Sequence, residues 1–292
     1  MEIKIAKDAG YCFGVRDAVS MAYDATDKFG KVYMLGSIVH NEKVVNDLEK
    51  SGAQIVDNLV DVPLDNPILF RAHGTTERLW KDAKEKGMNI LDATCPLVYE
   101  IHHEVKKLCS EGRKIIVIGD HGHDEVVAIA DQVKDAIIIS SIGDARKLRK
   151  MKKVGVVTQS TQDFNNVQEI INILMNKVFD LHFINTICYP TKRNHEQIIE
   201  ISKDSDIMLI IGSFTSANSK RLTKLSKDIN KNTYQVTNSD DLNALWFENK
   251  DSIGISAGAS TPDYLIEEVK NKIKLIYQEE LWKKAHLKLK LA

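Results

Sequence analysis

Three cysteines are the residues of this chain best suited to chemistry, because each occurs in the same local setting. Cys12, Cys95 and Cys188 each follow a short apolar or alternating run, and the steps between them are 83 and 93 residues. Three glycines that end other apolar runs are separated by the same two steps: Gly36, Gly119 and Gly212. Self-similarity at a fixed offset marks a repeated structural unit. The spacing predicts a pseudo-threefold protein whose three thiolates meet near the axis and hold a four-iron cluster with one iron unligated.

Two other interpretations of cysteine apply less well to these three residues. A single internal cysteine is usually a small buried apolar residue, and this interpretation suits Cys109, on the apolar side of a predicted helix. A zinc site with three cysteines normally takes its ligands from C-x-x-C or C-x-x-H pairs, and the sequence contains neither. No export signal precedes the first strand, so reduced thiols are expected.

The composition is that of a globular enzyme. The 292 residues include 43% hydrophobic and 28% charged residues, with a formal net charge of -1, so no basic excess suggests a nucleic-acid partner. No run approaches the roughly 18 apolar residues of a membrane span. These observations predict a cytoplasmic protein.

Short strand-like runs rich in Val and Ile alternate with amphipathic helical segments along nearly the whole chain. This alternation predicts an α/β protein with parallel sheets covered on both faces. The repeat divides it into units at residues 14–96, 97–187 and 188–270, and the N-terminal strand within residues 1–13 is expected to complete the third unit. Residues 271–292 are expected to form a C-terminal helix and tail.

Polar residues follow the glycine-ended strands, at turns that lead into helices. In open α/β sheets ligands bind at the carboxyl ends of strands, and helix N-termini there present N–H groups suited to a phosphate. Hydroxyl pairs also recur, and the first member of each is expected to cap a following helix: Thr75, Ser160 and Ser260.

A series of short motifs runs along the chain: Gly-Tyr-Cys12-Phe-Gly-Val, Ile-Val-His40-Asn, Arg-Ala-His73-Gly, Asp-Ala-Thr-Cys95-Pro-Leu-Val, Gly-His123-x-Glu125-Val, Thr158-Gln159, Thr186-Ile-Cys188-Tyr, Ser216-x-Asn218-Ser and Ala-Gly-Ala-Ser260-x-Pro. In these motifs and their order, from residue 2 to about residue 266, the sequence resembles the 4-hydroxy-3-methylbut-2-enyl diphosphate reductase family. Each motif is weak by itself, and the combination is highly specific.

The resemblance implies a trefoil of three α/β units around an oxygen-sensitive [4Fe-4S] cluster with three cysteine ligands and one open iron. It implies reductive removal of an allylic hydroxyl as water, giving isopentenyl and dimethylallyl diphosphate in the methylerythritol phosphate pathway. It assigns diphosphate binding to matching positions: His40, His73, His123, Ser216, Asn218 and Ser260. Glu125, helped by Ser160 or Thr161, would relay the proton. The implied protein is a monomer that takes electrons from ferredoxin or flavodoxin.

Several positions depart from the family's usual pattern. Asp124 replaces a usual Pro, Ala128 replaces a Gly, and Ser160 replaces a Thr. Ala217 stands where a second serine usually grips the diphosphate, and Phe214 precedes it. A divergent member acting on another small substrate is therefore the first alternative. A non-catalytic iron–sulfur sensor or electron carrier is the second, although such a protein has no use for the histidine, hydroxyl and acid set.

Overall fold

The computed structural model describes the backbone of residues 1–291 and the side chains of residues 1–279. Within these residues the strands form three four-stranded sheets, and every strand pair is parallel. The predicted α/β class with small parallel sheets is confirmed. The chain divides into two compact units, residues 13–191 and residues 1–12 with 192–292.

The first sheet has the strand order β3-β2-β4-β5. Its strands are β2 (Val32–Leu35), β3 (Ala53–Val56), β4 (Ile68–Phe70) and β5 (Ile90–Asp92), and its helices are α1 (Phe13–Phe29), α2 (Glu42–Lys50) and α3 (Glu77–Glu85). A 3-10 turn, η1 (Leu59–Asp61), lies between β3 and β4. The central strands β2 and β4 are fully buried, so they hold the connecting turns in fixed positions.

The second sheet repeats this pattern with the order β7-β6-β8-β9. Its strands are β6 (Lys114–Ile118), β7 (Ile137–Ile139), β8 (Met151–Thr158) and β9 (Val178–Phe183). The helices of this part are α4 (Pro96–Ser110), α5 (Asp124–Ala130), α6 (Ile142–Lys147) and α7 (Phe164–Met175). Two apolar clusters cover the sheet, one on the side of α7 and one on the side of α4 and α5.

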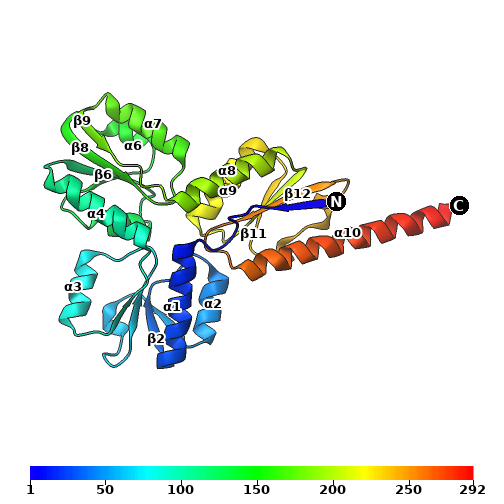
Figure 1. Cartoon of the computed structure of the whole chain (residues 1–292), viewed down its shortest axis with the longest axis horizontal. Coiled ribbons are helices and arrows are strands. Elements are labelled where there is room, and N and C mark those ends of the chain that lie inside the picture. The colour runs from blue at the N-terminus through cyan, green and yellow to red at the C-terminus, as the bar shows by residue number, and fades with distance from the viewer. Residues whose placement is uncertain (292) are drawn as a thin grey trace. The chain divides into compact units, whose positions relative to one another are not determined.

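The third sheet has the order β1-β12-β10-β11 and takes one strand from each end of the sequence. Its strands are β1 (Glu2–Ile5), β10 (Ile207–Ile211), β11 (Thr233–Val236) and β12 (Ser252–Ala257). The N-terminal strand β1 lies beside β12 in this sheet (Figure 1), and Glu2 pairs with Ser252. The helical elements are α8 (Tyr189–Lys203), α9 (Ala217–Ile229), η2 (Ser239–Asp241), η3 (Ala244–Phe247) and α10 (Asp263–Leu291).

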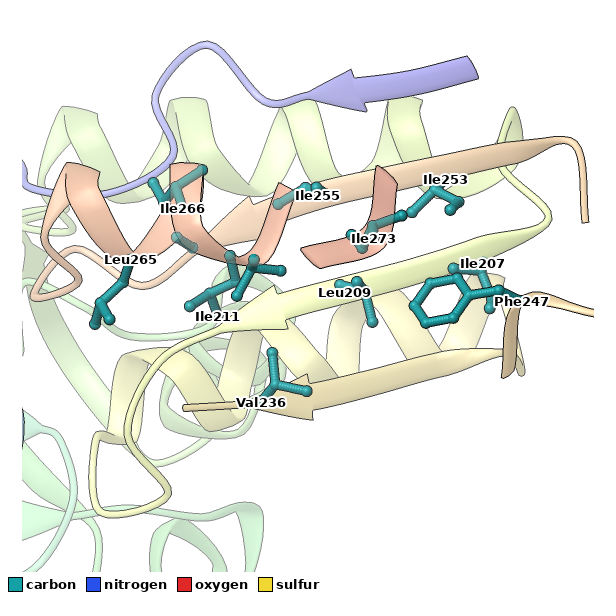
Figure 2. Close-up of a cluster of buried hydrophobic side chains, with 12 residues drawn as sticks. Ile207, Leu209, Ile211, Val236, Phe247, Ile253, Ile255, Leu265, Ile266 and Ile273 are labelled. Carbon is teal, nitrogen blue, oxygen red and sulfur yellow. The ribbon is translucent and has the colours of Figure 1, made fainter. Parts of the chain in front are cut away.

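The core of this third sheet shows why β10 reads as a continuous apolar run. Figure 2 shows Ile207, Leu209 and Ile211 on the side that packs against α10. Met208 and Ile210 point to the other side and pack with Ile198 of α8 and Leu222 of α9. A strand buried on both faces has no polar positions, so it lacks alternation.

The structure differs from the sequence expectations in three local features. Thr76, not Thr75, caps α3 by accepting from the Leu79 N–H, at 3.4 Å. Asp163, not Ser160, is the N-cap of α7. Residues 271–291 continue α10, which begins at Asp263, while Ala292 and the side chain of Trp282 lie outside the described residues. The boundaries predicted for three repeat units stay a prediction.

Candidate active site

Three imidazoles from three different turns meet in the unit formed by residues 13–191. His40 follows β2, His73 follows β4, and His123 follows β6 as the N-cap of α5. The ring centroids of His40 and His73 are 4.4 Å apart, and the His123 ring lies 5.2 Å from His40 and 5.6 Å from His73. The first two sheets therefore bring together, at their carboxyl ends, three histidines that lie 33 and 50 residues apart in the sequence.

In this histidine cluster (His40, His73 and His123), the surroundings of His40 and His73 favour neutral imidazoles. Burial lowers the pKa of His73 well below its usual value, and the nearby His40, His123 and Arg71 lower it further. Burial also lowers the pKa of His40, and Arg71 adds to this effect while Asp124 opposes it. Neutral imidazole donates one N–H, so these rings can still hydrogen-bond an anion at neutral pH.

An ion pair between Arg71 and Asp124, which was not predicted from the sequence, borders the histidine cluster. Nη1 of Arg71 lies 2.6 Å from Oδ2 of Asp124, and the same oxygen is 4.0 Å from Nε2 of His40. The Arg71 guanidinium packs over Gly36, where a Cβ would come within 2.6 Å of Nη1, so the glycine gives it room. Arg71 is the first residue of the Arg-Ala-His73-Gly motif, and that motif is the feature of the sequence that could have indicated its place near the histidines.

The carboxyl of Glu125 is buried beside this cluster and is hydrogen-bonded to Ser160 at the neighbouring strand end. The Ser160 N–H donates to Oε1 at 2.6 Å, and the Ser160 hydroxyl donates to Oε2 at 2.8 Å. Glu125 is only 2% exposed. The structure thus pairs the predicted acid with Ser160, while the hydroxyl oxygen of Thr161 accepts from the Gln159 side chain.

Two of the predicted cluster ligands lie in the same compact unit, and their surroundings suit thiolate ligands. The Cys95 N–H donates to the Ala72 carbonyl at 3.0 Å, and the Cys188 N–H donates to the Ser160 carbonyl at 2.9 Å. Both thiols are partly buried. A Cβ on Gly14 would overlap the Cys95 sulfur, so this position keeps the space beside the thiol open.

Cys12 lies in the other compact unit, where its N–H donates to the Ala259 carbonyl at 3.3 Å. The meeting of all three thiols around one cluster therefore stays a prediction. Cys109, in contrast, packs with the apolar residues of α4, β6 and β8, as expected for a structural cysteine.

The other predicted diphosphate ligands also lie in the unit of residues 1–12 and 192–292. Ser216 caps α9 by accepting from the Ser219 N–H at 3.3 Å, and Ser260 is 8% exposed. Nδ2 of Asn218 is buried and has no hydrogen-bond partner among the described residues, so this donor is available to a ligand. Phe214 is 54% exposed at the end of β10. The joint action of these residues with the histidines stays a prediction.

Comparison with known proteins identifies the group to which the chain is related. The family model for LytB protein matches residues 3–274. The chain belongs to the LytB family. Curated LytB relatives include the 4-hydroxy-3-methylbut-2-enyl diphosphate reductase of Geobacter metallireducens, 37% identical over 94% of this chain and 98% of the relative. The enzyme of the same name from Caldanaerobacter subterraneus is 36% identical over 96% and 99%.

Solved structures of reductases give the same result for the fold. The E-1-hydroxy-2-methyl-but-2-enyl-4-diphosphate reductase of Plasmodium falciparum has a TM-score of 0.87 at 30% identity, covering 94% of this chain and 87% of that one. A second structure, named as the terminal enzyme of the non-mevalonate pathway, has a TM-score of 0.70 at 33% identity, over 94% and 99%. The resemblance drawn from the motifs is confirmed. No helix in the described part of the chain is long and apolar enough to cross a membrane.

Proposed function

We propose that this LytB chain reductively removes the allylic hydroxyl of 4-hydroxy-3-methylbut-2-enyl diphosphate. The products are isopentenyl and dimethylallyl diphosphate. Its relatives carry the name of this activity. The observation in this chain that supports it best is the histidine cluster beside the buried Glu125–Ser160 pair, because it places anion donors and an acid at one end of two sheets.

The residues fit a cluster with three cysteine ligands at Cys12, Cys95 and Cys188. The backbone N–H groups of Cys95 and Cys188 are hydrogen-bonded, which fixes where these residues lie, and Gly14 leaves space beside the Cys95 sulfur. The family's [4Fe-4S] cluster supplies one-electron chemistry at an open iron when it is bound. The remaining work of binding, orientation and proton delivery falls to the protein.

The histidine cluster binds the diphosphate in this proposal. The neutral imidazoles of His40 and His73 donate N–H groups without bringing buried positive charges, whose desolvation is unfavourable. His40 also directly precedes Asn41, the N-cap of α2, so the positive end of that helix dipole lies close by. Ser216, Asn218 and Ser260 are proposed to complete the phosphate contacts.

Glu125 delivers the proton to the leaving oxygen. Removal of the hydroxyl consumes two electrons and two protons, forms one C–H bond, breaks one C–O bond and releases one water. Cleavage of the C–O bond needs an acid within hydrogen-bond reach. Ser160 fixes the position of the Glu125 carboxyl through two hydrogen bonds, and its hydroxyl offers a relay path from that carboxyl.

The electrons come from ferredoxin or flavodoxin in this proposal, and the protein acts as a cytoplasmic monomer. A one-electron carrier of this kind matches the two single-electron steps. The reducing environment of the cytoplasm would keep the ligand thiols reduced.

A divergent substrate is the second candidate, and Ala217 and Phe214 favour it. Ala217 removes a hydroxyl donor from the start of α9, and a hydrogen bond to a charged group contributes roughly 1.5–3 kcal/mol. Diphosphate affinity would fall about 10- to 100-fold unless backbone N–H groups compensate.

The experiment that tests the proposal is anaerobic turnover of 4-hydroxy-3-methylbut-2-enyl diphosphate per intact cluster, with reduced methyl viologen as electron donor. Turnover in the usual enzymatic range of roughly 1–10³ s⁻¹ would support both the reaction and the substrate. A loaded cluster without turnover would reject this substrate. An absorption spectrum that the substrate does not perturb would indicate a carrier or sensor.

A further inference from the structure

Asp124 places a negative charge inside a site that is otherwise arranged to receive an anion. Its carboxylate pairs with Arg71 at 2.6 Å and lies 4.0 Å from Nε2 of His40. The side chains of Arg71 and Asp124 are 22% and 30% exposed, so this pair is partly shielded from water. A shielded charge interacts more strongly with its neighbours than one on an open surface.

Arg71 lies beside the histidine cluster, and Asp124 engages it through an ion pair. The guanidinium packs against Gly36, and its Nη1 donates to the Asp124 carboxylate. A bound diphosphate would have to share or displace this internal carboxylate, because both anions require the same cationic and N–H donors. Like charges at close range weaken binding.

We propose that Asp124 is a specificity-determining residue that lowers the affinity of this site for diphosphates by acting as an internal anion. It neutralises Arg71 and faces His40 in the position that a phosphate oxygen would otherwise use. This inference rests on the proposed function, because it assumes that the histidine cluster receives the diphosphate. Asp124 alone would thus account for a lower diphosphate affinity in this chain.

The local backbone provides a variant of Asp124 that should fold. Asp124 is the first residue of α5, where proline is favoured because its missing N–H has no helical acceptor. The preceding residue, His123, has a ψ of 133°, within the extended range that a following proline requires. Asp124→Pro also restores the residue usual in the family, while Asp124→Asn keeps the side-chain shape and removes its charge.

The test measures binding of inorganic pyrophosphate to the cluster-loaded protein by calorimetry, and its inhibition of turnover. We expect both Asp124→Asn and Asp124→Pro to bind pyrophosphate about tenfold more tightly and to lower KM for the diphosphate substrate, with a much smaller effect on kcat. Asp131→Asn is the matched control, because it removes the same charge from an exposed position at the other end of α5.

The outcomes separate this inference from the proposed function. Calorimetry measures pyrophosphate binding without any turnover. A protein that is inactive with every substrate would therefore contradict the proposed function but would not contradict this inference. Unchanged or weaker pyrophosphate binding in both Asp124 variants, with melting temperatures like that of the unmodified protein, would overturn the inference. An equal gain in Asp131→Asn would also overturn it, because the effect would then follow net charge.

Discussion

Replacing Glu125 by glutamine separates the proposed proton delivery from the structural role of this side chain. In the protein, Oε1 accepts from the Ser160 N–H at 2.6 Å and Oε2 accepts from the Ser160 hydroxyl at 2.8 Å. Glutamine keeps the oxygen for the N–H, and its amide nitrogen can donate to the Ser160 oxygen instead. Both contacts survive in neutral form, so we expect a loss of about 1–2 kcal/mol in the free energy of unfolding.

The expected catalytic effect is much larger than the structural one. A positioned acid typically contributes about 10²–10⁴ to the rate, which corresponds to about 2.7–5.5 kcal/mol in the activation barrier. Glu125→Gln should therefore reduce kcat by two orders of magnitude or more, while cluster content and pyrophosphate binding stay near their original values. Ser160→Ala keeps the backbone donor and removes only the hydroxyl, so we expect a smaller loss of about tenfold.

The assay is anaerobic turnover with reduced methyl viologen, normalised to iron content, with thermal unfolding recorded for each variant. Glu169→Gln, an identical change at an exposed position of α7, is the control. A kcat for Glu125→Gln within about twofold of the original would refute the reasoning. A loss of iron in this variant would instead show that the carboxyl supports the cluster.

Three further predictions concern stability, cluster loading and binding. Burial lowers the pKa of His102 from 6.5 to about 4, so between these pH values the unfolded chain binds more protons than the folded one. The free energy of unfolding should therefore fall by up to about 3 kcal/mol as the pH is lowered from 6.5 to 4. His102→Phe should abolish this fall, as measured by urea unfolding at each pH. Gly14→Ala should lower the iron content per chain, since its Cβ would overlap the Cys95 sulfur; full loading would contradict this. Ala217→Ser should lower KM for the diphosphate substrate about tenfold, and an unchanged KM would mean that backbone groups already serve.

The repeat and the chemical motifs were readable from the sequence because they depend on local patterns. Buried central strands such as β6 and β10 are continuous apolar runs, and their spacing revealed three similar sheets. The strands β3, β5 and β11 lie at sheet edges and include partly exposed or exposed positions. Their apolar signal is accordingly weak.

The contacts within the candidate site depend on tertiary structure, so the sequence could suggest their members but not their pairing. Asp124 stood out only as a departure from the usual proline, whereas its bond to Arg71 joins residues 53 positions apart. The pairing of Ser160 with Glu125 also depends on how the end of β8 faces α5. Neither pairing leaves a periodic trace in the sequence.

The closure of the third sheet by β1 has a consequence for the order of folding during synthesis. β1 is synthesised long before its partner β12, which begins at Ser252. At typical elongation rates of about 5–20 residues per second, the N-terminal strand waits on the order of 10–50 s for its neighbour. The first two sheets can form during this interval, whereas the third can be completed only after β12 has emerged. An N-terminal truncation should therefore leave the edge of β12 unpaired and promote aggregation of late folding intermediates.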